Sequence, residues 1–414
     1  MGRRVMVYSH DTFGLGNIRR MLTISEHIRE TNPAVSLLLV TGSPMVHSFR
    51  IRPGLDYIKL PCLSRTGREE YRAKSLGTEI EHIIQLRSNL ILSATRDFEP
   101  EVVLIDKKPD GVKHELGEAL DYLRTELPDT RVALVLRDIL DEPQSTIAAW
   151  QQRNYHEVLR KFFHAVLVLG CREVFDVCGE YWFPADIQRL TKFCGYLRRP
   201  APAGDVAALR RNLLRNGERH LVLVTTGGGE DGYQLVKTYV EGLRHMPASA
   251  TVRSLIVCGP EMPREQRDAV AFAATGNPHV SIREFTGDLL SCMAAADVTV
   301  SMAGYNTICE ILSMGKRAVT VPRVRPVSEQ WIRAERLAKR GLLTAIQPDA
   351  LSPEKLANAV WQELIEERLR PQRSVNLGGL EAVSAWVTEA LAKMEAQEAI
   401  RIDTQLWSVA SPTY

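Results

Sequence analysis

The sequence predicts an α/β protein built from two doubly wound, Rossmann-like domains that face a cleft. Short apolar runs alternate with helical patterns along the chain, and the runs are continuous rather than alternating in polarity. Such runs are typical of a parallel sheet covered by helices on both faces. The alternation breaks once, at residues 197–204, where two prolines and a glycine in a stretch of small residues predict a linker.

The first domain is expected to span residues 1–198. Its strand candidates are rich in Val, Leu and Ile, and its helix candidates carry apolar residues at a spacing of three and four. The strands are expected at 5–8, 35–40, 57–60, 102–105, 132–136 and 165–169, and the helices at 17–31, 79–97, 114–126 and 145–163.

The second domain is expected to span residues 205–375, and residues 376–400 should form a helix that docks on the body. The docking helix is indicated by apolar residues at helical spacing over 379–395, whereas the chain from about 401 has no clear pattern and is expected to be mobile. The second-domain strands are expected at 221–225, 254–258, 280–283, 298–301 and 318–322, and the helices at 231–245, 264–274, 289–295, 307–314 and 328–339.

Composition narrows the class of protein. The 414 residues include 52 Lys and Arg against 50 Asp and Glu, a net charge of +2 that gives no reason to expect a nucleic-acid partner. No apolar run reaches the ~18–20 residues that cross a bilayer, and the N-terminal sequence lacks a signal-peptide pattern, so a cytoplasmic protein is expected. The seven cysteines show no C-x-x-C spacing and should be reduced, buried thiols.

The loop after the first strand carries titratable groups. Doubly wound sheets bind ligands beyond the carboxyl ends of their strands, so such loops are the expected place for chemistry. Here His10 is a candidate general base near neutral pH, and Asp11 is a candidate to orient it or to bind substrate hydroxyls. Gly14 and Gly16 form a G-x-G turn, with Asn17 as a candidate helix cap. An ordinary tight turn remains the alternative, since the third glycine of a dinucleotide fingerprint is missing.

Two loops of the second domain are weaker signals. Gly227, Gly228 and Gly229 leave backbone N–H groups open to a phosphate or a sugar, but the loop lacks the Gly-Lys-Ser/Thr of a P-loop. The alternative for this loop is a flexible hinge turn. Phe285 follows a strand and precedes a glycine, where it either frames a planar base or belongs to the core.

Residues 297–310 are the most informative stretch. An apolar strand stops at a small, polar turn over 301–307, and a helix follows at once. The unpaired N–H groups and the positive dipole end of such a helix make an anion site, and Glu310 could reach hydroxyls beside a bound phosphate. Phosphate and diol together indicate a nucleotide; the alternative is an ordinary turn with a solvated Glu. The expected ligand-binding residues of this turn are Ser301, Ala303, Gly304, Tyr305, Asn306 and Thr307.

A last loop carries arginines from a strand into a helix. Arg323 and Arg325 could neutralise a diphosphate or an anionic sugar, and Glu329 and Gln330 follow in the first helical turn. Gln330 has donors and acceptors suited to sugar hydroxyls. A basic surface loop is the alternative.

Together these motifs resemble a known family. The runs 284–310 and 321–330, with the glycines 227–229, are similar to the C-terminal domain of GT-B-fold nucleotide-sugar glycosyltransferases, especially the branch of the peptidoglycan N-acetylglucosaminyltransferase MurG. The resemblance covers about 220–345 well and the N-terminal loop moderately, and elsewhere it is one of architecture. It implies the GT-B arrangement of two domains around a cleft.

The resemblance also implies residue roles. The turn 301–307 would bind the donor diphosphate, Glu310 the ribose, Phe285 the base, and Gln330, next to Glu329, the donor sugar. One departure concerns the N-terminal loop, where this group often has Gly-x-Gly-His-x-x-Arg. Asn17 stands at the His position, and because an amide cannot act as a general base, His10 becomes the expected base.

The implied function is transfer of a sugar from a nucleoside-diphosphate sugar, UDP-linked by family default, to an unidentified acceptor. The mechanism would be inverting and metal-independent, with no cofactor beyond the co-substrate, and no Asp-x-Asp motif is present. A sugar-nucleotide hydrolase or epimerase of the same fold, and a non-catalytic sugar-nucleotide sensor, remain alternatives. Peripheral membrane contact, with the helix at 79–97 forming an acceptor groove, also stays open.

Overall fold

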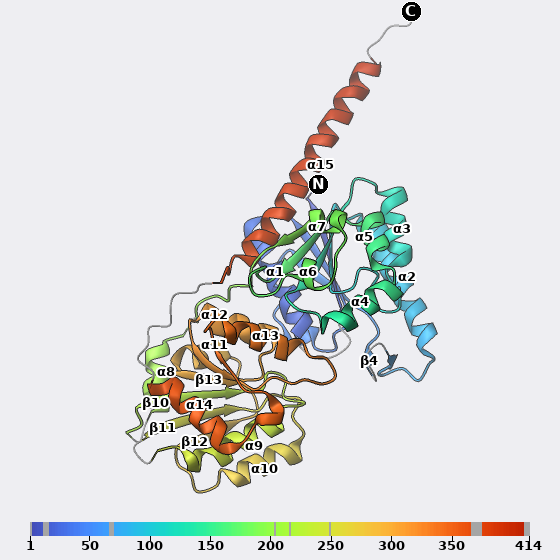
Figure 1. Ribbon diagram of the computed structural model, residues 1–414. Helices are drawn as coiled ribbons and strands as arrows, with labels where there is room; N and C mark the ends of the chain where they lie inside the picture. The colour runs from blue at the N-terminus through green and yellow to red at the C-terminus, as the bar shows by residue number, and fades with distance from the viewer. Residues whose placement is uncertain are drawn as a thin grey trace, which may run out of the picture.

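The computed structural model describes residues 2–10, 16–65, 70–202, 204–214, 217–247, 250–365 and 375–409. Two α/β domains lie one above the other, each built on a parallel sheet between layers of helices (Figure 1). The predicted fold class is confirmed. The first sheet lies within the segment expected as the first domain, and the second sheet within the segment expected as the second.

The first sheet has seven parallel strands in the order β3-β2-β1-β6-β7-β8-β9. Chain-distant β1 and β6 are neighbours, so the winding direction reverses between them, and this is the switch point at which such sheets bind ligands. The strands are β1 (Arg4–Ser9), β2 (Ser36–Thr41), β3 (Leu55–Lys59), β6 (Val102–Asp106), β7 (Arg131–Arg137), β8 (Ala165–Leu169) and β9 (Thr191–Phe193).

Helices cover both faces of this sheet, because successive residues of one strand enter different cores. Val5 and Val7 pack in one cluster, and Met6 and Tyr8 in another. The helices are α1 (Gly16–Thr31), α2 (Ile80–Phe98), α3 (Gly117–Glu126), α4 (Pro143–Gln152), α5 (Tyr155–Phe162), α6 (Val177–Glu180) and α7 (Ala185–Leu190). A small antiparallel hairpin, β4 (Leu63–Arg65) with β5 (Tyr71–Ala73), stands apart from the sheet.

The prediction of one helix over 145–163 is wrong. The chain forms α4 and α5 instead, and Asn154 lies between them with a left-handed backbone, φ 52°. Asn tolerates this conformation better than most residues, so it can end one helix and start another.

The second sheet has the parallel order β12-β11-β10-β13-β14-β15, with its own switch point between β10 and β13. Its strands are β10 (His220–Thr225), β11 (Val252–Val257), β12 (Val280–Arg283), β13 (Val298–Ser301), β14 (Arg317–Thr320) and β15 (Thr344–Ala345). Its helices are α8 (Val206–Leu213), α9 (Tyr233–Gly242), α10 (Arg264–Ala273), α11 (Leu289–Ala295), α12 (Tyr305–Ser313), α13 (Glu329–Lys339) and α14 (Pro353–Ile365). Turns of 3-10 helix occur at Val46–Ser48, Leu243–His245 and Pro348–Ala350.

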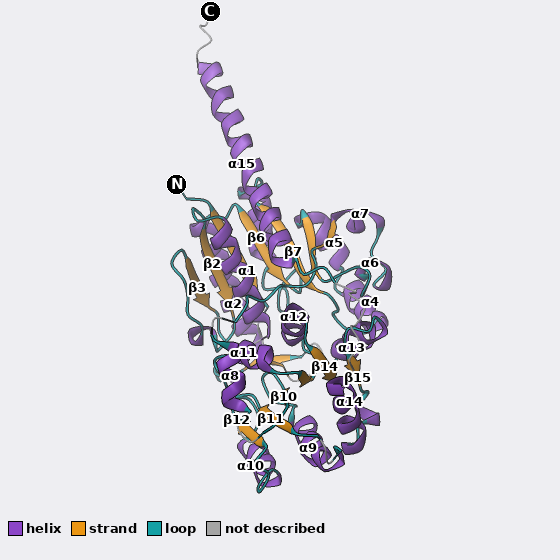
Figure 2. Ribbon diagram, turned by 90° about the vertical axis from the view of Figure 1, so that its left-hand side faces the viewer, coloured by secondary structure: helices purple, strands orange, loops and turns teal. Residues whose placement is uncertain are grey.

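The last helix, α15 (Gly379–Val409), follows the second domain in sequence but packs on the first. Val383 and Val387 are fully buried, and Thr388 Oγ1 donates to Asn32 Oδ1, at the end of α1, over 3.0 Å. The helix runs on past the body of the first domain (Figures 1 and 2) and is longer than the 379–395 segment that the sequence predicted. None of the helices in the described part of the chain is long and apolar enough to cross a membrane.

The two domains share a continuous hydrophobic core. One cluster joins Ile18 of α1 with Tyr196 in the connecting segment and Ile308 of α12. Buried polar contacts reinforce this junction, and they also shape the cleft.

Candidate active site

A cleft of about 1350 Å³ lies between the domains. It is lined by the segments after β1, β2, β6 and β7 in the first domain, and after β10, β11, β12, β13 and β14 in the second. These are carboxyl ends of parallel strands, where the sequence places the chemistry. The predicted site residues that line the cleft are Gly16, Asn17, Gly227, Gly228, Gly229, Phe285, Gly304, Tyr305, Asn306, Thr307, Arg323, Glu329 and Gln330.

The remaining predicted residues fall into two groups. Asp11 and Gly14 lie outside the described residues. His10, Ser301, Ala303 and Glu310 are described but are not among the cleft-lining residues.

The N-terminus of α12 opens into the cleft. Gly304 is its N-cap residue and makes no side-chain capping hydrogen bond, and Tyr305, Asn306 and Thr307 of the first turn line the cavity. The first N–H groups of a helix lack intrahelical partners, and the helix dipole is positive there. The arrangement therefore suits an anion such as a phosphate.

Two predicted residues of the same stretch lie behind this surface. Ser301 ends the buried strand β13 and is fully buried. Ala303 has a left-handed backbone, φ 58°, and its carbonyl accepts a 3.1 Å hydrogen bond from Arg333 Nη1. Both residues shape the turn from within, so contact with a ligand falls to the residues from Gly304 onward.

Glu310 is also fully buried, and its partner comes from the other domain. Glu310 Oε1 lies 2.7 Å from Nη2 of Arg19, whose side chain is 36% exposed and lines the cleft. Glu310 thus lies one layer behind the anion site, and Arg19 separates it from the cavity. A ligand diol could reach the carboxylate only by displacing or sharing this guanidinium.

Asn17 and His10 belong to a partly buried network at the start of α1. The helix begins at Gly16, so Asn17 lies in the first turn rather than at the cap. Its Nδ2 donates to the His10 carbonyl over 2.5 Å, and its Oδ1 accepts from Arg20 at 3.1 Å. Arg20 also pairs with Asp106 at the end of β6, over 2.6 Å. Asn17 therefore helps to fix the turn between β1 and α1, at the position where the family resemblance leads us to expect His.

His10 itself is 1% exposed at the end of β1. Its backbone N–H donates to Asp106 Oδ2 over 3.3 Å, which ties the strand end to the Arg20–Asp106 pair. The imidazole is thus held at the switch point of the first sheet, underneath the cleft lining rather than in it.

The domains are joined beneath the cleft by a buried ion pair. Arg333 of α13 donates to both carboxylate oxygens of Asp138, at 2.7 and 2.8 Å, and Tyr196 OH donates to the same carboxylate at 3.1 Å. The Tyr305 ring lies between two guanidinium groups, 5.7 Å from that of Arg333 and 5.8 Å from that of Arg20. This geometry is typical of cation–π contacts and holds the start of α12 against the first domain.

A second link borders the cleft itself. Glu329, at the first turn of α13, pairs with Arg137 at the end of β7, and the Ser328 N–H donates to Asp141 Oδ1 over 3.0 Å. Burial raises the pKa of Glu329, but Arg137 and Arg333 outweigh that effect and the net pKa is lowered. Glu329 is therefore an ionised bridge between domains.

The glycine loop after β10 lies in acidic surroundings. Gly229 has φ 99°, and a Cβ there would come within 2.3 Å of the Cys258 carbonyl, so the loop requires glycine to approach β11. Burial and then the neighbouring charge of Asp231 raise the pKa of Glu230, and burial and Glu230 raise that of Glu261. A loop flanked by these carboxyls suits sugar hydroxyls better than a diphosphate.

Phe285 and Gln330 lie on the second-domain wall. Phe285 is 61% exposed, which excludes the core-residue alternative and leaves its ring available to a ligand. Gln330 Oε1 accepts a hydrogen bond from the Arg323 N–H over 3.2 Å, and Arg323 pairs with Asp231 at 3.0 Å. These contacts orient the amide and the arginine at the edge of the cavity.

Several lining residues were missed by sequence reasoning. Lys107 and Lys108 follow β6, Arg137 ends β7, and Asp141 follows it. All of them could have been found by asking which charged residues follow each first-domain strand. Arg19 gave no such signal, because its role depends on a partner in the other domain.

Comparison with known protein families finds a match in the second domain. Its sequence matches the Glycosyltransferase family 28 C-terminal domain over residues 221–377. The second domain is therefore similar to this family's C-terminal domain. The match begins within β10 and spans every second-domain loop that lines the cleft.

Individual proteins are similar to parts of this chain. An uncharacterized glycosyltransferase of Methanopyrus kandleri is 29% identical over 167 residues, which are 40% of this chain and 44% of that protein. A UDP-N-acetylglucosamine–N-acetylmuramyl-(pentapeptide) pyrophosphoryl-undecaprenol N-acetylglucosamine transferase of Syntrophotalea carbinolica is 30% identical over 106 residues, 25% of this chain and 29% of that protein. The chain thus matches less than half the length of these relatives.

Among solved structures, MurG of Acinetobacter baumannii has a TM-score of 0.60 and 14% sequence identity, over 94% of this chain and 99% of that one. This likeness shows the fold of both domains. The family model, the sequence relatives and this shared fold together confirm the resemblance to MurG-like GT-B glycosyltransferases.

Proposed function

We propose that the protein is a glycosyltransferase that moves a sugar from a UDP-linked donor to an acceptor hydroxyl, with inversion and without a metal ion. The observation that carries the proposal is the uncapped N-terminus of α12, which opens into the interdomain cleft within the family 28 domain. Helix N–H groups and dipole there would stabilise the negative charge that develops on the departing diphosphate.

The donor would lie along the second-domain wall. Its diphosphate would rest on residues 304–307, with Phe285 against the base and Gln330 on the sugar. Glu310 would bind the ribose once the nucleotide displaces or shares Arg19, whose guanidinium would then be free to face the diphosphate. The glycine loop 227–229, with the neighbouring Glu230 and Glu261, would bind some of the sugar hydroxyls.

The acceptor would approach from the first domain, where a general base must take its hydroxyl proton. His10 is the residue that the sequence favours, with Asp11 as its helper. Asp141 is a second candidate, because it belongs to the first-domain wall of the cleft. Replacing His10 by Gln and Asp141 by Asn, one at a time, distinguishes them: the base variant loses turnover and keeps donor binding.

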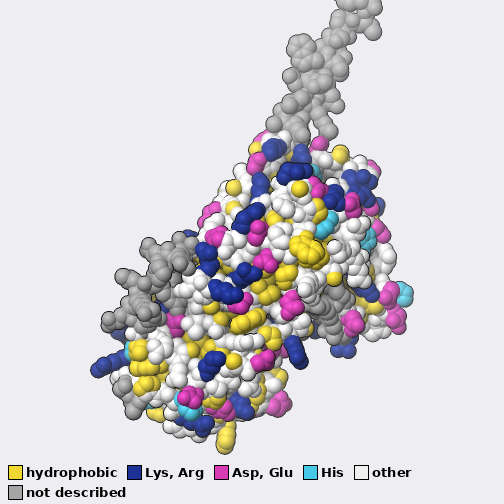
Figure 3. All heavy atoms as spheres, in the orientation of Figure 1, with side chains coloured by type: hydrophobic (Ala, Val, Ile, Leu, Met, Phe, Trp, Pro, Cys, Tyr) yellow, Lys and Arg dark blue, Asp and Glu magenta, His cyan; other side chains and the backbone are white. Residues whose placement is uncertain are grey.

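The cysteines and the surface of the protein bear on its compartment and on its class of partner. All seven cysteines are free thiols, which suits a reducing compartment such as the cytoplasm. Lys and Arg are interspersed with Asp and Glu over the face shown in Figure 3, a pattern that favours small-molecule substrates over nucleic acid. Peripheral membrane contact would be compatible with the half-exposed Leu86 and Leu90 on α2.

The test has two stages. UDP and UDP-sugars should raise the melting temperature, by about 5 °C at a roughly hundredfold excess over Kd, while adenine nucleotides should not. Acceptor-dependent release of UDP would then establish transfer. Rapid release of free sugar from donor alone would instead identify a hydrolase, and binding without any turnover a sensor. If no nucleoside diphosphate shifted the melting temperature, the donor site would be wrong.

A further inference from the structure

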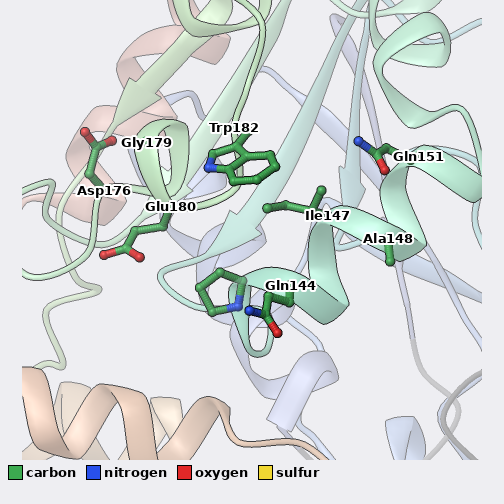
Figure 4. A pocket seen from close by; sticks show the side chains of 9 residues that line it. Gln144, Ile147, Ala148, Gln151, Asp176, Gly179, Glu180 and Trp182 are labelled. Atoms are coloured by element: carbon green, nitrogen blue, oxygen red, sulfur yellow. The ribbon is translucent and has the colours of Figure 1, made fainter.

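A groove separate from the cleft lies on the first domain, between α4 and α6, with a volume of about 660 Å³. Trp182 stands in it with 72% of its surface exposed. Figure 4 shows the indole and the Ile147 side chain pointing toward one another, with Gln144 and Gln151 on the α4 side and Asp176 and Glu180 on the other. Tryptophan is rarely this exposed, because its ring gains much from burial.

The backbone conformation at Trp182 indicates that this residue is not there to stabilise the fold. Residue 182 lies just past α6 with φ 53°, its N–H donates to the Gly179 carbonyl, and the Phe183 N–H donates to the Cys178 carbonyl. This is a Schellman ending, whose left-handed position strongly favours glycine. A bulky residue there is strained, and such strain is retained where a ligand or a reaction uses the side chain.

The chemistry of the groove selects among ligands. Its lining combines the indole with Ile147. Its polar groups include the side-chain amides of Gln144 and Gln151, which make no hydrogen bond within the described chain. None of the described residues that line it is Lys or Arg, and Asp176 and Glu180 also line it. Glu180 pairs with Arg336 and Asp176 with Arg172. A phosphate, a nucleotide or an anionic lipid would therefore find no lysine or arginine among the described lining residues to bind it. A neutral, hydroxyl-rich ring fits, because its C–H face can stack on the indole while the amides bind its hydroxyls.

The groove and the cleft lie on opposite sides of one helix, α4. Ser145, Ala149 and Trp150 of α4 line the cleft, whereas Gln144, Ile147 and neighbouring residues of the same helix line the groove. The two sites are thus separated by about one helix diameter, roughly 10 Å. A chain of a few sugar residues can span that distance.

We infer that the Trp182 groove binds a neutral sugar residue of the acceptor, remote from the residue that receives the transferred sugar. This inference rests on the proposed transferase function and adds to it an acceptor class, an oligosaccharide or glycoconjugate. The ring of Trp182 supplies stacking, and Gln144 and Gln151 supply hydrogen bonds.

The decisive variant is Trp182→Gly, because glycine suits the left-handed position and should fold at least as well as the natural residue. The control is Phe272→Ala, which removes an 82% exposed aromatic ring from α10 in the other domain. Binding is first screened on an array of neutral and acidic oligosaccharides. The strongest neutral binder is then titrated by calorimetry against the full-length wild type and both variants.

Wild type and Phe272→Ala should bind the neutral oligosaccharide equally, and Trp182→Gly should bind it about tenfold more weakly. UDP should raise the melting temperature of all three proteins alike, so failure of the donor site is seen separately. Unchanged glycan binding by Trp182→Gly, or an array without any neutral binder, overturns the inference. The inference is also overturned if Trp182→Gly loses binding to phosphatidylcholine vesicles but keeps its glycan binding. The groove would then be a membrane contact.

Discussion

At the scale of single residues, the Arg19–Glu310 pair links donor recognition to the domain junction. Glu310 is fully buried, and Arg19 lies on a different domain with a partly exposed side chain. A buried carboxylate that loses its partner keeps its desolvation cost, so Arg19→Met should destabilise the protein by about 1–3 kcal/mol, less than a fully buried pair because Arg19 reaches solvent.

A double-mutant cycle with Glu310→Gln isolates the pair. Gln keeps the shape and removes the charge, so Arg19→Met should cost about 1–2 kcal/mol less in the Glu310→Gln background. The measurement is the free energy of unfolding in urea for the four proteins. Additive effects would mean that the two side chains do not interact in solution.

Glu261 gives a pH-dependent prediction. Burial and the nearby Glu230 raise its pKa, so the folded state holds the proton more tightly than the unfolded chain does. The stability from this group is therefore present at low pH and is lost as the pH rises through the folded pKa. Glu261→Gln should raise the melting temperature by about 1–2 °C at pH 8 and leave it unchanged at pH 4. An equal shift at both pH values would assign the effect to packing rather than to charge.

The position of a residue relative to the cleft was predictable from sequence only where its partner is local. The glycines of 227–229 and the turn at 304–307 could be read from strand-end motifs, because their geometry depends on neighbouring backbone. The burial of Glu310 could not, because it depends on Arg19 in the other domain. The structural role of Asn17 could not be predicted either. Its side-chain amide donates a hydrogen bond to the His10 carbonyl, a contact that the sequence alone does not reveal.

At the scale of elements, α12 offers a test in which stability and binding move in opposite directions. Thr307 is in the first turn of the helix and lines the cleft. A carboxylate there suits the helix dipole, so Thr307→Glu should keep or slightly raise the melting temperature. It should also repel a diphosphate and weaken UDP binding about tenfold or more. Calorimetric titration with UDP provides the measurement.

Thr307→Gln is the matched control for this substitution. It has nearly the shape of Glu without the charge, so it should bind UDP at least several times better than Thr307→Glu does. Uridine, which lacks the diphosphate, should bind the two variants with similar affinity. If Glu and Gln weakened UDP equally, the cause would be steric, and the anion would not rest on the helix end.

Element prediction succeeded for strands whose apolar pattern is continuous. It failed for short strands, for the helices α6, α7, α8 and α14, and where a single backbone angle decides. All the strands expected in the two sheets are present, whereas the short strands β9 and β15 and the hairpin β4–β5 were missed. These are edge or isolated pieces of two or three residues, too short to show a pattern. The split between α4 and α5 depends on the left-handed Asn154, which apolar spacing does not report.

At the scale of the whole molecule, the Arg333–Asp138 pair decides how firmly the two domains act as one. Both side chains are buried and bonded in two places across the domain boundary. Asp138→Asn removes the charge that balances a buried guanidinium, so unfolding should become easier by about 3–5 kcal/mol. The two domains should then unfold in two calorimetric transitions rather than one, because the polar contact that couples them is lost.

The control for this prediction is the same substitution at an exposed pair. Asp186 binds Arg160 within the first domain, at 2.6 Å, with both side chains well exposed. Exposed ion pairs contribute little, so Asp186→Asn should leave a single transition with a melting temperature close to that of the wild type. If Asp138→Asn behaved like Asp186→Asn, the shared hydrophobic core around Tyr196 and Ile308 alone would hold the domains together. The cleft would then owe its width to apolar packing, and the buried charges would only orient the residues that line it.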